Sequence, residues 1–128
     1  MGMKAYYIDT QTDECEVIDV EPKLDEYHRL IRCDCIDIVT REVQGRKYNI
    51  VLDDEGLLKP NRISATSVEA DLFGNQERLA GSLLIFGVDE IDYDLRSLTD
   101  DEVEQIKRRI TDARFADGSR HPVFCYSR

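Results

Sequence analysis

Residues 81–88 read G-S-L-L-I-F-G-V and form the densest apolar run in the chain. Four apolar residues follow one another from Leu83 to Phe86, so the run lacks the alternation that would leave one face in water. A short continuous apolar run bounded by glycines is typical of a strand that is buried on both faces. We therefore expect a central strand here, with the rest of the chain packed on or beside it.

The charge of the chain limits the partners that it can bind. Its 128 residues suit one domain, and a net charge of −10 leaves little basic surface to neutralise phosphates. We predict no direct nucleic-acid binding; the acidic surface serves solubility or meets a basic partner. The sequence shows no apolar run of membrane-spanning length and no signal-peptide pattern, which predicts a cytoplasmic protein without membrane contact.

The cysteine pattern argues against a metal site. The chain has four cysteines, namely Cys15, Cys33, Cys35 and Cys125. The pair at 33 and 35 lacks the C-x-x-C spacing of a redox or zinc site, although His28 and His121 lie near cysteines in the sequence. We predict reduced thiols, no structural disulfide, no metal and no cofactor.

Four further segments have the composition of strands and predict two hairpins. Residues 4–9 and 15–20 are rich in aromatic and β-branched residues and enclose a polar turn. Residues 35–43 and 47–52 enclose a turn at Gln44-Gly45-Arg46. A hairpin is therefore expected on each side of a helix.

Two amphipathic helices are predicted. The first opens at Pro22, where a missing N–H costs nothing, and carries an apolar stripe at helical spacing to its end near Cys33. The second begins after Thr99, which is spaced three residues before Glu102 as in a capping box. We expect both helices to cover the same face of the sheet.

These elements predict a single α+β domain with a mainly antiparallel sheet in the order ββαββ, irregular segment, β, α. The irregular segment covers residues 57–80, the domain covers residues 3–110, and residues 111–128 form a C-terminal extension. The extension turns apolar at residues 123–126. That patch suits either a short strand at a sheet edge or a homodimer contact.

Three segments resemble a family of short domains of unknown function found mainly in bacteriophages and mobile elements. They are D-E-G-L-L-K-P-N-R at residues 54–62, L-A-G-S-L-L-I-F-G at residues 79–87 and L-R-S-L-T-D-D-E at residues 95–102. The family pattern runs N-E-E-G-K-L, P-N-R, G-T-x-L-I-V-G and F-R-S-L-T-D-E-E, and the similarity covers about residues 3–110. The resemblance implies a phage or plasmid accessory protein and brings no established activity.

No motif in the chain specifies catalysis. The nucleophile elbow, the Walker loop and the dinucleotide fingerprint do not occur in the sequence, and its carboxylates fall in turns. The leading interpretation is non-catalytic binding of a host protein or a small anionic ligand. Two alternatives stay open. One is a small hydrolase or nucleotide-processing enzyme, and the other is an acidic DNA mimic built on the eight acidic residues between 89 and 104.

The candidate binding residues are the polar ones inside the family-like segments, namely Lys59, Asn61, Arg62 and Arg96. Pro60 stiffens the backbone beside the first three, and Arg96 precedes a helix N-terminus, where the backbone favours an anion. If the loop folds over that helix start, the four side chains line one anion site. If each cation instead pairs with its own carboxylate, the four only fasten the loop.

Overall fold

The computed structural model describes residues 2–70 and 72–127. None of the helices in these residues has the length and apolar character needed to cross a membrane. The elements, in chain order, are β1 (Met3–Ile8), β2 (Cys15–Val20), α1 (Leu24–Ile31), β3 (Ile36–Val43), β4 (Arg46–Asp53), the 3-10 turn η1 (Gly56–Leu58), β5 (Ile63–Ala70), β6 (Gln76–Ala80), β7 (Leu83–Val88), β8 (Leu95–Arg96), α2 (Asp100–Arg108), β9 (Ile110–Arg114) and β10 (Arg120–Tyr126).

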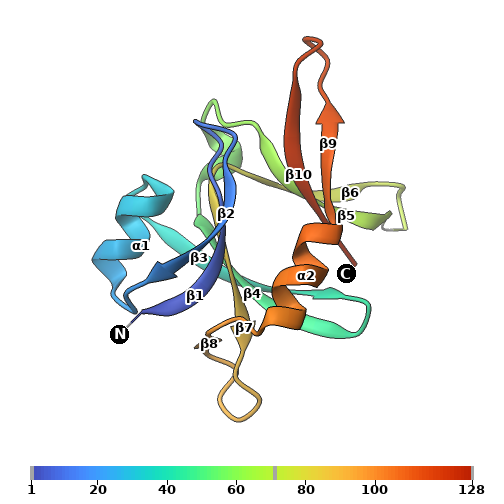
Figure 1. The fold of residues 1–128 in the computed structure, drawn as a ribbon. Coiled ribbons are helices and arrows are strands. Elements are labelled where there is room, and N and C mark those ends of the chain that lie inside the picture. The colour runs from blue at the N-terminus through green and yellow to red at the C-terminus, as the bar shows by residue number, and fades with distance from the viewer. Residues whose placement is uncertain (1, 71, 128) are drawn as a thin grey trace.

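Strand β7 lies in the middle of the larger sheet, whose order is β2-β1-β7-β4-β3 with β8 beside the end of β7 (Figure 1). Every residue of β7 is buried. It pairs antiparallel with both β1 and β4, so its backbone groups find partners on both sides. The central strand and the two flanking hairpins predicted from the sequence are confirmed.

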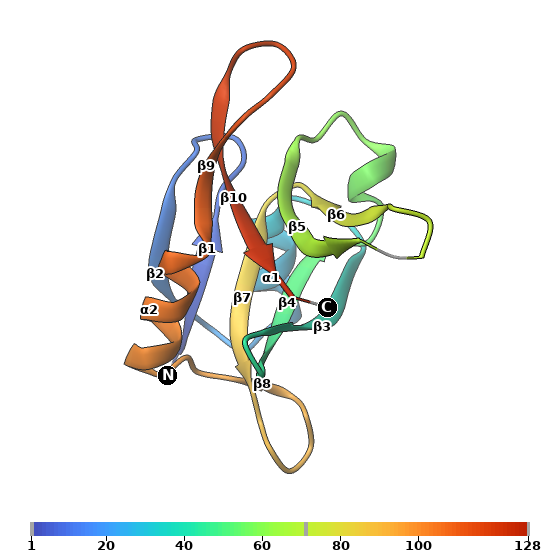
Figure 2. The ribbon, with the colours of Figure 1, turned by 90° about the vertical axis from the view of Figure 1, so that its right-hand side faces the viewer.

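The two faces of β7 belong to different cores. Leu83 and Ile85 point into a cluster that includes the α2 residues Val103 and Ile106. The alternate side chains of β7 point into a second cluster, together with Tyr27 and Ile31 of α1. The helices therefore cover opposite faces of the sheet, as Figures 1 and 2 show, and the expectation of a shared face was wrong. Amphipathicity specifies that a helix packs on a sheet but not on which face it packs.

The segment predicted to be irregular contains a hairpin of a second sheet, ordered β6-β5-β10-β9. β5 and β6 pair antiparallel with two register shifts, and β5 carries small and hydroxyl side chains. These features break the period of two that marks a strand in sequence. The two strands of this segment therefore lack the regular pattern that would have predicted them.

The C-terminal residues form part of the fold. β10 lies between β5 and β9, parallel to the first and antiparallel to the second, so it is an interior strand. Phe124 and Tyr126 are fully buried in the same cluster as α2. The apolar side chains that suggested a homodimer contact therefore pack inside their own chain.

Polar side chains join the two sheets. Arg41 on β3 donates from Nε to Glu77 on β6 at 2.6 Å, and the hydroxyl of Tyr126 on β10 donates to the same carboxylate. Burial, the Glu77 hydrogen bond and the Glu77 charge raise the pKa of Tyr126, so its hydroxyl stays protonated. One carboxylate thus connects three strands from two sheets.

An ion pair between an exposed arginine and a buried carboxylate attaches α1 to the end of β1. Arg32 follows the helix with φ 62°, in the left-handed region that closes helix C-termini. Its two terminal nitrogens donate to the two carboxylate oxygens of Asp9 at 2.9 and 3.0 Å. These hydrogen bonds hold the pKa of Asp9 at about 2, below its ordinary value.

We expect Asp9→Asn to destabilise the protein only where Asp9 is ionised. A depressed pKa adds stability that is complete above the unfolded value and is lost as the pH falls towards the folded one. The free energy of unfolding should differ between wild type and variant by about 2 kcal/mol at pH 6, and the gap should close between pH 4 and 2. Denaturant titrations at each pH measure this difference in the free energy of unfolding. Asp19→Asn is the control, because Asp19 is exposed. A gap independent of pH would contradict this account.

Candidate functional site

The three predicted site residues near η1 have partners of their own. Lys59 Nζ lies 2.7 Å from Asp53 Oδ2, and that carboxylate is buried. Arg62 forms an ion pair with Asp13 of the β1–β2 turn. Asn61 Nδ2 donates to the Gly56 carbonyl at 3.4 Å and lies against Gly81. Each side chain therefore fastens this loop to the body of the protein.

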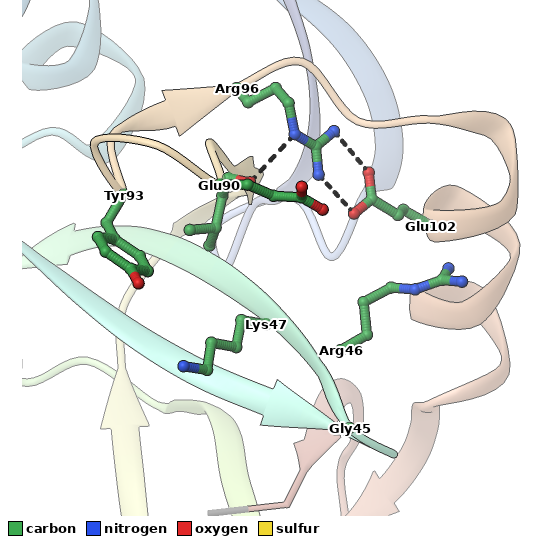
Figure 3. A pocket seen from close by; sticks show the side chains of 8 residues that line it. Gly45, Arg46, Lys47, Glu90, Tyr93, Arg96 and Glu102 are labelled. Carbon is green, nitrogen blue, oxygen red and sulfur yellow. Dashed lines mark hydrogen bonds and ion pairs between the residues drawn. The ribbon is translucent and has the colours of Figure 1, made fainter.

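Arg96, on β8, also has partners of its own. Its terminal nitrogens donate to Glu102 at 2.9 and 2.8 Å, and its Nε donates to the Val88 carbonyl at 3.2 Å (Figure 3). The guanidinium lies on Gly87, where an added Cβ would come within 2.6 Å of it. Gly87 therefore leaves the space that the guanidinium occupies here.

The structure does not bring the four predicted residues together. Asn61 lies against Gly81, just before β7, whereas Arg96 pairs with Gly87 near the far end of that strand. The η1 loop and β8 accordingly lie at opposite ends of the molecule in Figures 1 and 2. The single anion site expected from these four residues is not assembled, because each cation has found a carboxylate nearer in the fold.

Glu102 has two roles at the start of α2. Its carboxylate accepts the Thr99 backbone N–H at 2.9 Å while the Thr99 hydroxyl accepts the Glu102 N–H at 3.2 Å, which confirms the predicted capping box. Burial alone would raise the pKa of Glu102, but the hydrogen bonds from Arg96 and Thr99 outweigh it and lower the pKa. The buried carboxylate therefore stays ionised and holds β8 to α2.

A cleft beside this ion pair gathers cations from two elements. It is lined by Gly45, Arg46, Lys47, Val88, Glu90, Tyr93, Arg96 and Glu102 and has a volume of about 390 Å³. That volume is near the lower end of the roughly 300–1,000 Å³ typical of small-molecule sites. The β3–β4 turn forms one wall and the 88–96 segment forms the other (Figure 3).

Arg46 and Lys47 are the cations in the cleft that have no carboxylate partner. Both are exposed, and among the described residues no carboxylate lies within ion-pair distance of either. Arg46 lies near the Tyr48 hydroxyl, whose pKa is raised by burial and lowered to a lesser extent by the guanidinium. With three cations against two carboxylates, the cleft carries one excess positive charge in an acidic protein.

The sequence interpretation missed Arg46, Lys47 and Tyr93. The available signal was two consecutive cations at a hairpin turn in a chain of net charge −10. Two adjacent cations exposed at a turn indicate a place where an anion can bind, although Glu42 lies opposite Lys47 in the hairpin.

A second cluster joins Asp13, His121 and Ser119. His121 Nδ1 lies 2.9 Å from Asp13 Oδ2, and its Nε2 lies 2.8 Å from Ser119 Oγ. This is the order of contacts in a Ser-His-Asp hydrolase, but Ser119 Oγ donates to Asp117 Oδ1 at 2.5 Å and so directs its proton away from the imidazole. The cluster fastens the β9–β10 hairpin to the β1–β2 turn.

The remaining polar groups that the sequence singled out do not form a site. All four cysteines are free thiols. Across residues 2–70 and 72–127, the His, Cys, Asp and Glu side chains do not form a group of three that could hold a metal ion. Within the acidic 89–104 run, Glu102 pairs with Arg96 and Asp89 accepts backbone N–H groups of its own turn. The other six acidic side chains of the run are exposed.

Comparison with known protein families identifies the family of the chain. A family described as a domain of unknown function (DUF3846) matches residues 3–111, which is most of the sequence. The chain belongs to this family. Searches of curated proteins and of solved structures each found no match. The family carries no stated activity, so the function has to be argued from the site.

We expect Glu102→Gln to lower the free energy of unfolding by about 2–4 kcal/mol, because it leaves the Arg96 charge without its partner. The matched control is Glu104→Gln on the same helix, whose exposed carboxylate lies 3.6 Å from Lys107. It should change stability by less than about 0.5 kcal/mol. Urea unfolding monitored by circular dichroism measures both. Equal effects from the two variants would show that the buried pair is not a structural tie.

Proposed function

We propose that this protein is a non-catalytic binding module, an accessory protein of a phage or other mobile element, that takes a small anionic ligand in the cleft beside β8. The observation that carries the proposal is the position of Arg46 and Lys47, two cations that line the cleft and lack a carboxylate partner among the described residues. A charged side chain in such a place offers its hydrogen bonds to a ligand.

Arg96 contributes by holding the wall of the cleft. Its guanidinium is fixed by Glu102 and by the Val88 and Ser97 carbonyls, so the 88–96 segment is ordered before a ligand arrives. Preorganisation lowers the entropy that binding costs. Arg96 therefore acts as a positioning residue. Arg46 and Lys47 follow one another on β4 and point apart in Figure 3, so Lys47 makes the contact with the ligand and Arg46 adds its charge to the cleft.

The size and charge of the cleft favour a small ligand over a polynucleotide. A cleft of about 390 Å³ accommodates one small molecule. The single excess charge in it can balance a phosphate or carboxylate, whereas the net charge of −10 repels a longer polyanion. The partner class that fits is therefore a small organic or inorganic anion.

The proposal is tested by NMR titration of the ¹⁵N-labelled protein with inorganic phosphate at low ionic strength. We expect saturable shifts at the amides of Gly45, Lys47 and Glu90. The Arg46→Gln, Lys47→Gln double variant should weaken binding at least about tenfold, because it removes the charge-assisted contact and the excess positive charge of the cleft. The melting temperature should stay unchanged, because both side chains are exposed.

Arg120→Gln is the matched control, because it removes an exposed cation from β10, outside the cleft. It should leave phosphate binding unchanged. Shifts that do not saturate, or that survive in the double variant, would overturn the proposal.

A further inference from the structure

Tyr93 presents its ring at the mouth of the same cleft. The ring is 66% exposed and lines the cavity together with Lys47 (Figure 3). A single exposed aromatic ring is common on a protein surface, but this one stands in a cleft beside a cation that has no carboxylate partner among the described residues. A ligand that has a flat ring and an anionic group would use both features.

The backbone of Tyr93 is held in an unfavourable conformation. Its φ of 60° lies in the left-handed region, which is strained for a residue with a large side chain. Strain of this kind persists only where surrounding contacts fix it, and such positions cluster at ligand sites. A glycine would adopt this turn at lower cost, yet the position carries an aromatic ring.

The contacts that fix Tyr93 come from the core of the sheet. Asn49 on β4 is 2% exposed, and its Nδ2 donates to the Tyr93 carbonyl at 3.1 Å. Its Oδ1 in turn accepts from the Thr40 hydroxyl at 2.6 Å, which orients the amide. The Tyr93 N–H donates to the Asp89 carbonyl at 2.9 Å. A buried polar network therefore sets where the ring stands.

We propose that the ligand of this cleft is a nucleoside monophosphate, with its base stacked on Tyr93 and its phosphate bound by Lys47, which extends from β4 on the side of Tyr93. This inference rests on the proposed function and names its ligand class. Stacking on an aromatic side chain suits any base, because every base offers a π-face. The phosphate carries a charge of nearly −2 at pH 7, which favours a contact with the Lys47 ammonium in a cleft of net positive charge. A single nucleotide avoids the repulsion that the acidic surface imposes on a longer strand.

The test is calorimetric titration of the full chain with adenosine monophosphate and with inorganic phosphate, under identical conditions. Wild type should bind the nucleotide at least about tenfold more tightly than phosphate, because only the nucleotide can stack. Tyr93→Leu should remove this advantage while leaving phosphate affinity unchanged. Tyr93→Phe should keep the advantage, because it retains the ring.

Ile91→Ala is the matched control, because Ile91 is an exposed apolar residue of the same turn that does not line the cleft. It should keep the tenfold preference. The inference fails, and the proposed function stands, if phosphate binds in the cleft but the nucleotide binds no more tightly or Tyr93→Leu keeps the preference. If neither phosphate nor the nucleotide binds, both fail.

Discussion

The burial of β7 on both faces is the constraint on which the rest of the structure depends. A strand with apolar side chains on both faces needs cover on each side, and no single helix can supply it. Here α1 covers one face, while α2 and the second sheet cover the other. The C-terminal strand β10 belongs to that cover through Phe124 and Tyr126, so it takes part in the core although all of it lies beyond the family match.

The three segments that resemble the family pattern make close backbone contacts at the two ends of β7. Gly56 lies so close to the Ala80 carbonyl that a Cβ would come within 2.5 Å of it, and Gly81 adopts a φ of 88° beside Asn61. At the other end, Gly87 leaves room for the Arg96 guanidinium. The residues of these segments thus have structural reasons for their identity. The cleft cations Arg46 and Lys47 lie outside the segments, which separates the architecture of the domain from its proposed ligand site.

The features predicted from sequence are those encoded in neighbouring residues. The apolar run of β7, the two hairpins around α1 and the capping box at Thr99 all depend on local spacing, and the structure confirms them. The second sheet was missed because β5 pairs in parallel with a strand about sixty residues away and has an irregular register with β6. The four-residue anion site expected from the sequence is not assembled for a related reason. A cation in an acidic chain pairs with whichever carboxylate the fold brings close, as Arg62 does with Asp13, and spacing along the chain does not reveal that partner.

Native-state hydrogen exchange tests the central role of β7 most directly. If the whole fold depends on this strand, the amides of Leu84, Ile85 and Phe86 should exchange only through global unfolding. Their opening free energies should then equal the value from denaturant titration. The amides of α1 and of the edge strand β2 should open at lower free energies, since α1 packs on only one face of the sheet and β2 pairs with only one strand. Exchange of the β7 amides through smaller openings than those of α1 would contradict this account.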